Sequence, residues 1–253
     1  MAAPYQPERD VEQKIAMTHS QVLSSNIASL RAHIAQCAAD ARRNPAEITL
    51  LAVSKTRNTD EVADAVANGL TNIGENYLQE AREKQQALSH LNICWHFIGP
   101  IQSNKTREIA EHFSWVHSVD RLKIARRLSD QRPTSLPPLN ICLQVNISEE
   151  ATKSGVLPSN ALDLARGVAA LPGLTLRGLM AIPAASTDLA EQRQAFAQLR
   201  QLRDQIASAL PELTLDTLSM GMSGDIDAAI LEGSTLLRVG TAIFGPRTSA
   251  TKN

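Results

Sequence analysis

The stretch Ile48–Thr56, ITLLAVSKT, joins a short apolar run to a lysine. Its four consecutive apolar residues, Leu50 to Val53, are typical of a strand buried on both faces, as strands of a parallel sheet are. The run ends at Ser54 and Lys55, which places an ammonium group at the carboxyl end of the strand. A lysine there either marks the point where a strand meets water or anchors a bound molecule covalently. The pattern of one strand does not distinguish these interpretations.

Segments of the same kind recur along the chain and alternate with helical patterns. Eight segments are expected to form strands: residues 48–56, 71–77, 95–101, 115–119, 140–148, 176–182, 217–223 and 236–245. Helical patterns cover residues 20–43, 58–69, 103–113, 120–131, 158–173, 191–210 and 225–233. We expect side-chain caps at the starts of several helices, from Thr59 or Asp60, from Asp120 and from Asp225.

This alternation predicts an α/β fold, because strands separated by helices form a parallel sheet. Eight such units in 253 residues fit a single TIM-type (β/α)8 barrel, with the helix over residues 20–43 as an extra N-terminal element. A doubly wound open sheet is the alternative. We divide the chain into a polar extension, residues 1–18, expected to be disordered, and one barrel domain, residues 19–253.

The composition excludes several classes of function. The formal net charge is −1 and no long basic run is present, which disfavours nucleic acid or an anionic membrane as the main partner. The three cysteines, Cys37, Cys94 and Cys142, form no C-x-x-C pair, so we expect reduced thiols and no metal. The first residues lack the apolar core of a signal peptide, and no apolar run is long enough to span a membrane. We therefore expect a cytoplasmic protein.

Polar side chains are expected to collect at the carboxyl ends of the strands, where parallel barrels carry their active sites. The predicted strands deliver Lys55, Asn76, Asn146, Met180 and Arg238 to that end, among others. Because side chains alternate along a strand, an inward Lys55 implies an inward Leu51 and Val53, and an inward Arg238 implies an inward Leu236 and Gly240. Both strands would then fill the lower layers of the barrel mainly with aliphatic groups and keep the ionic group at its mouth.

The last two predicted strands indicate an anion site. Residues 219–230, SMGMSGDIDAAI, end a strand and open a helix within a few residues, and Gly240 and Thr241 follow the next strand. Small residues let backbone amides approach an anion, and barrels often bind phosphate beside the seventh and eighth strands. Glycines at such positions also form turns, so the spacing alone leaves both interpretations open.

A lysine near a phosphate site is compatible with two chemistries. It can form a Schiff base with a sugar-phosphate carbonyl, as in class I aldolases, or with pyridoxal phosphate. Burial lowers the pKa of a lysine and so supplies neutral amine for imine formation. An aldolase normally also needs an acid or base beside the lysine, and Glu75 is the one obvious strand-end carboxylate.

Several motifs, in order and spacing, resemble the YggS/PROSC family of pyridoxal phosphate homeostasis proteins. These single-domain proteins are relatives of the alanine racemase N-terminal barrel. The motifs are AVSKT, GENYLQEAREK, WHFIGPIQSNK, VHSVD, QVNIS followed by KSG, GLMAI, LSMGMSGD and GSTLLRVGTAIFG, and the match as a whole runs from about Ile48 to Arg247. The resemblance therefore covers nearly all of the predicted barrel and favours pyridoxal phosphate over a sugar phosphate.

The resemblance implies a role for each of ten residues. Lys55 would hold pyridoxal phosphate as a Schiff base, and Arg238 would face the pyridine nitrogen. The phosphate would be held by Ser223, Gly240 and Thr241, with Ser219 nearby, and the cofactor would be lined by Asn76, Met180 and Met220. His96 is a further pocket candidate, or else a hydrogen-bonded structural histidine.

The resemblance also implies a function in intracellular pyridoxal phosphate homeostasis, by buffering or transfer of the cofactor with little or no turnover. Apoenzymes that use pyridoxal phosphate would be the recipients, and the protein would be a monomer or a weak homodimer. Alanine racemase takes a second base, a tyrosine, from a separate domain, for which we expect no room in a chain that stops at Asn253. The alternative is a pyridoxal phosphate-dependent amino-acid racemase of low activity, and a Schiff-base aldolase is a third, more distant one.

Overall fold

The computed structural model describes residues 18–150 and 152–246. The predicted disordered extension lies outside these residues except for Thr18, which is ordered as the cap of the first helix. Its hydroxyl accepts a hydrogen bond from the backbone N–H of Gln21, and the Gln21 side chain accepts one from the backbone N–H of Thr18. This reciprocal arrangement is a capping box, and it satisfies two amides that the helix itself leaves unpaired.

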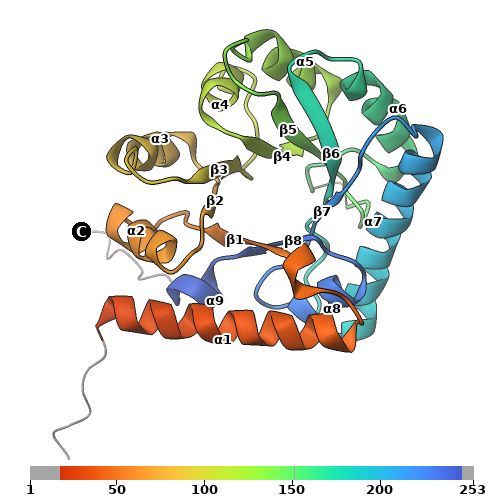
Figure 1. The fold of residues 1–253 in the computed structure, drawn as a ribbon. Helices are drawn as coiled ribbons and strands as arrows, with labels where there is room; N and C mark the ends of the chain where they lie inside the picture. The colour runs from red at the N-terminus through yellow and green to blue at the C-terminus, as the bar shows by residue number, and fades with distance from the viewer. Residues whose placement is uncertain (1–17, 151, 247–253) are drawn as a thin grey trace, which may run out of the picture.

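Eight parallel strands close into a barrel, in which each strand pairs with its neighbours in sequence and the last pairs with the first (Figure 1). The strands are β1 Thr49–Val53, β2 Asn72–Glu75, β3 Cys94–Phe97, β4 Trp115–Val119, β5 Leu139–Gln144, β6 Leu174–Met180, β7 Thr217–Ser219 and β8 Leu236–Val239. The predicted (β/α)8 barrel is therefore confirmed, and the open doubly wound sheet is excluded by the pairing of β1 with β8.

Helices cover the outside of this barrel. They are α1 His19–Asp40, the short 3-10 helix η1 Pro45–Glu47, α2 Thr59–Ala67, α3 Leu78–Ala87, α4 Thr106–His112, α5 Leu122–Gln131, α6 Pro158–Ala169, α7 Leu189–Ala209, α8 Ile226–Leu231 and α9 Thr241–Phe244. The predicted extra helix is α1, which runs along the barrel beside α8 and α9 (Figure 1). No helix in the described ranges is long and apolar enough to cross a membrane.

Some local predictions are wrong. The strand predicted over residues 236–245 ends at Val239, and its second half forms α9. Helix α2 is capped by the Asn58 side chain rather than by Thr59 or Asp60, because Asn58 is the residue with extended backbone before the helix. The Asp120 carboxylate does not cap α5 and instead pairs with the Arg121 guanidinium at 2.7 Å.

Two further differences concern helices α3 and α8. Sequence analysis did not assign α3, whose first turn follows Tyr77 directly, with no side-chain cap to mark its start. At α8, Asp225 stands in the cap position, but its carboxylate does not bond to the helix amides. It accepts a 2.5 Å hydrogen bond from the backbone N–H of Met222, so it closes the loop before the helix.

The strands present two different faces. Leu237 and Val239 of β8 belong to the apolar cluster that joins strands to helices, whereas Arg238 between them makes side-chain hydrogen bonds to β7. His117 of β4 bonds to Ser219 of β7, and a contact between strands so far apart in the barrel has to cross its interior. The barrel interior therefore contains polar groups, and the alternation expected for β8 is confirmed.

Candidate functional site

The carboxyl end of the barrel carries Lys55 in the turn that follows β1. Ser54 is buried, Lys55 is half-buried and Thr56 is exposed, so the chain leaves the core within three residues. Thr56 has a φ of 65°, a left-handed conformation that is uncommon for a β-branched residue. Such a turn needs support from its surroundings, and the structure supplies it from α3.

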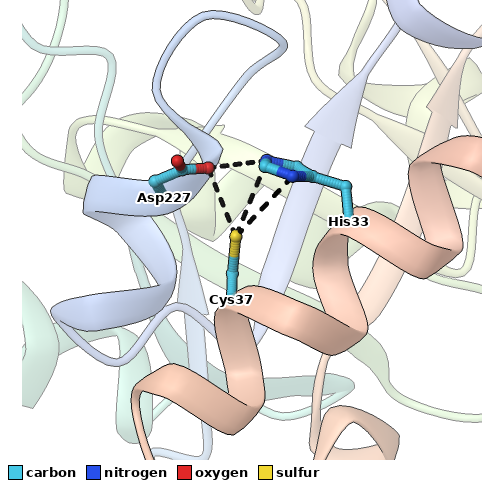
Figure 2. Close-up of side chains that lie close together, drawn as sticks. All are labelled: His33, Cys37 and Asp227. Carbon is cyan, nitrogen blue, oxygen red and sulfur yellow. Dashed lines mark hydrogen bonds and ion pairs between the residues drawn. The ribbon is translucent and has the colours of Figure 1, made fainter.

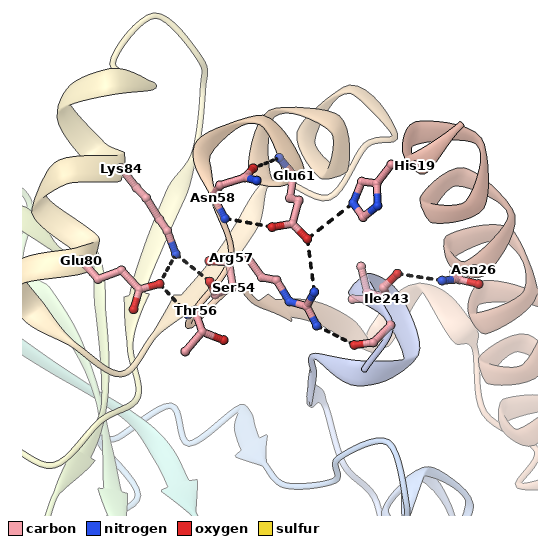
Figure 3. A network of polar contacts seen from close by, with 11 residues as sticks. His19, Asn26, Ser54, Thr56, Arg57, Asn58, Glu61, Glu80, Lys84 and Ile243 are labelled. Carbon is pink, nitrogen blue, oxygen red and sulfur yellow. Dashed lines mark hydrogen bonds and ion pairs between the residues drawn. The ribbon is translucent and has the colours of Figure 1, made fainter. Parts of the chain in front are cut away.

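Two side chains of α3, those of Lys84 and Glu80, hold the backbone on either side of Lys55 (Figure 3). The Lys84 ammonium donates 2.6 Å hydrogen bonds to the carbonyl oxygen of Ser54 and to carboxylate oxygens of Glu75 and Glu80. The same Glu80 oxygen accepts a 2.5 Å bond from the backbone N–H of Thr56. One ammonium and one carboxylate thus fix the residues immediately before and after Lys55.

The carboxylate of Glu75 lies at the centre of this network and is fully buried. It accepts a 2.5 Å bond from the Ser54 hydroxyl in addition to the Lys84 bond. Burial raises the pKa of Glu75, while the Lys84 charge and the hydrogen bonds from Lys84 and Ser54 lower it, and burial is the larger effect. Sequence analysis considered Glu75 as an acid or base for aldolase chemistry, but in the structure it is a buried partner of Lys84.

Arg57 connects the lysine turn to the end of β8. Its guanidinium pairs with Glu61 at 3.2 Å (Figure 3). It also donates a 2.5 Å bond to the carbonyl oxygen of Gly245 and lies over the Phe244 ring. Phe244 closes α9, whose first residue is Thr241. The turn that carries Lys55 and the predicted phosphate-binding segment are thus held in one assembly.

Arg238 lies buried inside the barrel mouth. One guanidinium nitrogen donates to the carbonyl oxygen of Ser219 at 2.5 Å and to its hydroxyl at 2.9 Å, and the other donates to the carbonyl oxygen of Ala181 at 3.0 Å. Burial lowers the pKa of Arg238 to about 10, so the group remains a cation at neutral pH. A guanidinium only donates hydrogen bonds, so a ring nitrogen placed against it has to act as an acceptor.

A chain of hydrogen bonds extends from Arg238 through the barrel interior. The Ser219 hydroxyl lies 2.8 Å from Nδ1 of His117, Nε2 of His117 lies 2.9 Å from Nδ1 of His96, and Nε2 of His96 lies 3.1 Å from Oδ1 of Asn72. Asn72 is the first residue of β2, so the chain crosses from the carboxyl end of the barrel to the amino end.

The direction of this chain follows from its last acceptor. Since Oδ1 of Asn72 can only accept, each neutral histidine donates from Nε2 and accepts at Nδ1, and Nδ1 of His117 takes the hydrogen of the Ser219 hydroxyl. Both rings are neutral, because burial lowers the pKa of His96 to about 3 and that of His117 well below its ordinary value. His96 also stacks on Trp115. The hydrogen-bonded structural interpretation of His96 is the one that these contacts support.

The loops after β7 and β8 meet at the predicted phosphate site. The hydroxyl of Ser223 accepts a 3.4 Å hydrogen bond from the backbone N–H of Ala242, and both Ser223 and Thr241 are exposed. A Cβ atom on Gly240 would lie 3.2 Å from the carbonyl oxygen of Val53, so a glycine lets β1 and β8 approach closely here. These three residues present small groups at an open edge, as an anion cradle requires.

The remaining predicted residues are distributed differently. Met180 is buried at the end of β6. Met220 is also buried, but its side chain belongs to the apolar cluster between the strands and the helices. Asn76 is half-buried, and its Oδ1 atom is a buried acceptor with no hydrogen-bond partner in the part of the chain that the structure describes. An acceptor of this kind fits a bound molecule with a donor group.

Three residues that support the site, Lys84, Glu80 and His117, were not predicted from the sequence. All three lie in motifs that carried the resemblance, namely GENYLQEAREK and VHSVD. The structure shows why their spacing was uninformative: Lys84 reaches Ser54 across 30 residues, and His117 reaches Ser219 across 102.

Comparison with known proteins places this barrel among close relatives. The family described as alanine racemase, N-terminal domain, matches residues 23–248. The pyridoxal phosphate homeostasis protein of Pseudomonas aeruginosa is 59% identical over 89% of this chain and 96% of its own length. The protein of the same name from Escherichia coli K12 is 48% identical over 89% of this chain and 97% of its own.

Solved structures agree with these matches. PipY of Synechococcus elongatus, with pyridoxal phosphate bound, is 36% identical, superposes with a TM-score of 0.78 and covers 88% of this chain and 100% of its own. Alanine racemase from Corynebacterium glutamicum is 16% identical, with a TM-score of 0.64 over 91% of this chain and 62% of its own, and it shows the shared fold alone.

Proposed function

Since this chain belongs to the pyridoxal phosphate homeostasis protein family, we propose that it binds pyridoxal 5′-phosphate as a Schiff base on Lys55 and buffers or hands on the cofactor with little turnover. The observation that carries the proposal is the support around Lys55. Lys84 and Glu80 fix the backbone on both sides of it, at the same end of the barrel as Arg238, Ser223 and Gly240.

The residues present fit this cofactor. Lys55 supplies the amine, Asn76 an unpartnered acceptor, Arg238 a buried cation, and the loops after β7 and β8 small groups for the phosphate. When bound, pyridoxal phosphate supplies an electrophilic aldehyde and an electron-withdrawing ring. These residues would orient that ring, and the barrel interior below them is filled by buried side chains, among them Leu51 and His117.

Arg238 supports the low turnover that we propose. Its guanidinium keeps its proton, so the ring nitrogen that it would face stays an unprotonated acceptor. An unprotonated ring withdraws electrons less strongly than the pyridinium that an aspartate would stabilise, so the removal of a substrate proton is assisted less. Tyr77, the tyrosine nearest to Lys55 in sequence, is 57% exposed, which disfavours it as a protected second base.

The test is the visible absorption spectrum of the purified protein before and after borohydride, for the wild type, Lys55→Ala and the control Lys105→Ala. Lys105 is exposed, and its ammonium pairs with Glu108 at 3.6 Å. We expect a yellow wild type and control, with the colour converted by borohydride to a covalent adduct on Lys55, and no such adduct in Lys55→Ala. A colourless wild type that takes up no added pyridoxal phosphate would overturn the proposal.

Two further measurements separate a carrier from an enzyme. Transfer is tested by mixing the yellow protein with a pyridoxal phosphate-dependent apoenzyme and measuring how fast the apoenzyme becomes active. Direct transfer predicts activation faster than the release of pyridoxal phosphate from the protein after dilution into buffer. Exchange of an amino acid's α-proton in heavy water tests the alternative, a racemase of low activity. Exchange well above the rate with free cofactor, abolished by Lys55→Ala, would favour the racemase.

A further inference from the structure

A thiol, an imidazole and a carboxylate converge between helices α1 and α8 on the outside of the barrel (Figure 2). His33 and Cys37 lie one turn apart on the same face of α1, and Asp227 comes from the first turn of α8. Nε2 of His33 lies 2.6 Å from Oδ1 of Asp227 and 3.6 Å from Sγ of Cys37, and Sγ lies 3.3 Å from Oδ1. Three ligand atoms from two helices therefore surround one point.

The geometry differs from that of a cysteine nucleophile. A Cys–His–Asp relay needs the thiol on one ring nitrogen of the histidine and the carboxylate on the other. Here both Sγ of Cys37 and Oδ1 of Asp227 are closest to the same nitrogen, Nε2, while Nδ1 lies farther from Sγ, at 4.0 Å. A shared nitrogen cannot relay a proton between the other two groups, but it can face a common ion.

We propose that His33, Cys37 and Asp227 form a binding site for a divalent transition-metal ion of the zinc type. Thiolate, imidazole and carboxylate are the ligands that zinc takes, at about 2.3, 2.0 and 2.1 Å. Tetrahedral geometry then separates sulfur from nitrogen or oxygen by about 3.6 Å and nitrogen from oxygen by about 3.3 Å. The Sγ–Nε2 distance already has this value, whereas the Sγ–Oδ1 distance has to open by about 0.3 Å and the Nε2–Oδ1 distance by about 0.7 Å.

The exposure of the three groups suits a site of this kind. The thiol of Cys37 is 8% exposed and forms the floor, whereas the side chains of His33 and Asp227 are 49% and 55% exposed and can adjust. The described residues provide three ligand atoms for a metal ion that takes four, so a water molecule would be the fourth ligand. The thiolate and the carboxylate together balance the charge of a divalent ion.

Metal binding here has to displace a proton. Without an ion, the Cys37 thiol donates a 3.3 Å hydrogen bond to Oδ1 of Asp227, so the sulfur carries its proton. A metal ion binds the thiolate, so the S–H bond breaks, the metal–sulfur bond forms and one proton leaves to solvent. Affinity therefore rises with pH. His33, Asp227 and Asp40 are the titratable groups that face the thiol, and the imidazole has to be neutral to bind.

The first experiment titrates zinc into the purified protein against a chromophoric chelator, for the wild type and for Cys37→Ser, His33→Gln and Asp227→Asn. We expect one equivalent in the wild type and an affinity at least about tenfold weaker in each variant, since even a residue outside the coordination sphere contributes about that much. His33 and Asp227 are exposed, so their variants test the site without disturbing the core. Cys94→Ser is the matched control, because that thiol is also free.

Cobalt supplies a second readout that reports the sulfur itself. Difference spectra, taken against the same sample before cobalt, remove the cofactor's own absorbance. We expect a thiolate-to-cobalt charge-transfer band that zinc abolishes and that is absent in Cys37→Ser. The site would be overturned if the wild type took up no zinc, or if all three variants bound zinc as tightly as the wild type. Neither outcome bears on Lys55, because this inference is independent of the proposed function.

Discussion

The Nζ atom of Lys84 donates a 2.6 Å hydrogen bond to the carbonyl oxygen of Ser54, the residue that precedes Lys55. This bond crosses from α3 to the end of β1 and comes from an ammonium that is almost completely buried. The same ammonium neutralises the buried carboxylate of Glu75. The lysine proposed to bind the cofactor is thus positioned by a second lysine, whose side chain is only 4% exposed.

Replacing Lys84 by methionine should destabilise the protein by about 3–5 kcal/mol, because it leaves the Glu75 carboxylate buried without its partner. Urea unfolding measures this loss. Lys105→Met is the control, and it should cost less than about 1 kcal/mol because its ion pair with Glu108 is half exposed. Pyridoxal phosphate binding to folded Lys84→Met should also weaken. Equal losses of unfolding free energy in the two variants would show that the buried ion pair stabilises the protein no more than the exposed one does.

Removing the Ser219 hydroxyl should disturb the chain of hydrogen bonds below Arg238. In Ser219→Ala, Nδ1 of His117 becomes a buried acceptor without its donor, which costs about 1–3 kcal/mol. Arg238 also loses one of its three bonds, so we expect the absorption band of the bound cofactor to shift. Ser208→Ala, which removes an exposed hydroxyl bonded to its own helix, should leave both stability and spectrum unchanged. A spectrum identical to that of the wild type would show that this chain of hydrogen bonds does not affect the bound cofactor.

The two buried histidines should make stability depend on pH. Their pKa values are lowered in the folded state, to about 3 for His96, so the unfolded chain binds more protons below its own pKa of about 6.5. The unfolding free energy should therefore fall with decreasing pH below about 6.5, by about 1.4 kcal/mol per pH unit for each histidine. Comparing urea unfolding at pH 7 and pH 5 measures this slope.

The carboxyls act in the opposite direction in the same experiment. Burial raises the pKa of Glu75 and of Asp225, so each contributes stability that is lost as pH rises through its folded pKa. These contributions cancel when the wild type is compared with His96→Gln/His117→Gln, because both proteins carry them. The double variant should lose the acid-dependent slope, and His90→Gln, at an exposed position, should keep it. Parallel pH curves for all three proteins would contradict the assignment of neutral histidines.

A methyl group on Gly240 should weaken cofactor binding through the phosphate. The Cβ atom of Gly240→Ala would lie 3.2 Å from the carbonyl oxygen of Val53, which forces the start of α9 to move. We expect pyridoxal phosphate to bind about tenfold more weakly, a cost of about 1.4 kcal/mol, while pyridoxal, which lacks the phosphate, is unaffected. Gly224→Ala is the control, because nothing lies within 4 Å of its Cβ position. An equal loss for both ligands would place the effect outside the phosphate site.

The order and type of most helices and strands follow from the amino-acid sequence alone, as do the residues at the carboxyl ends of the strands. Burial on both faces makes Leu50 to Val53 a continuous apolar run, and the alternation of such runs with amphipathic helices specifies a parallel sheet. These properties depend on neighbours within a few residues, so they can be read from the chain directly. The motifs around Lys55 and Arg238 likewise identified a cofactor through resemblance.

Only the tertiary structure decided which distant groups meet. The bonds of Lys84 to Ser54, of the histidines between Arg238 and Asn72, and of Cys37 to Asp227 join residues that are 21 to 190 positions apart. A hydrogen bond or a metal site depends on distances of a few ångströms between side chains. Strand register and helix packing fix those distances, and both follow from the closure of the whole barrel rather than from any local pattern.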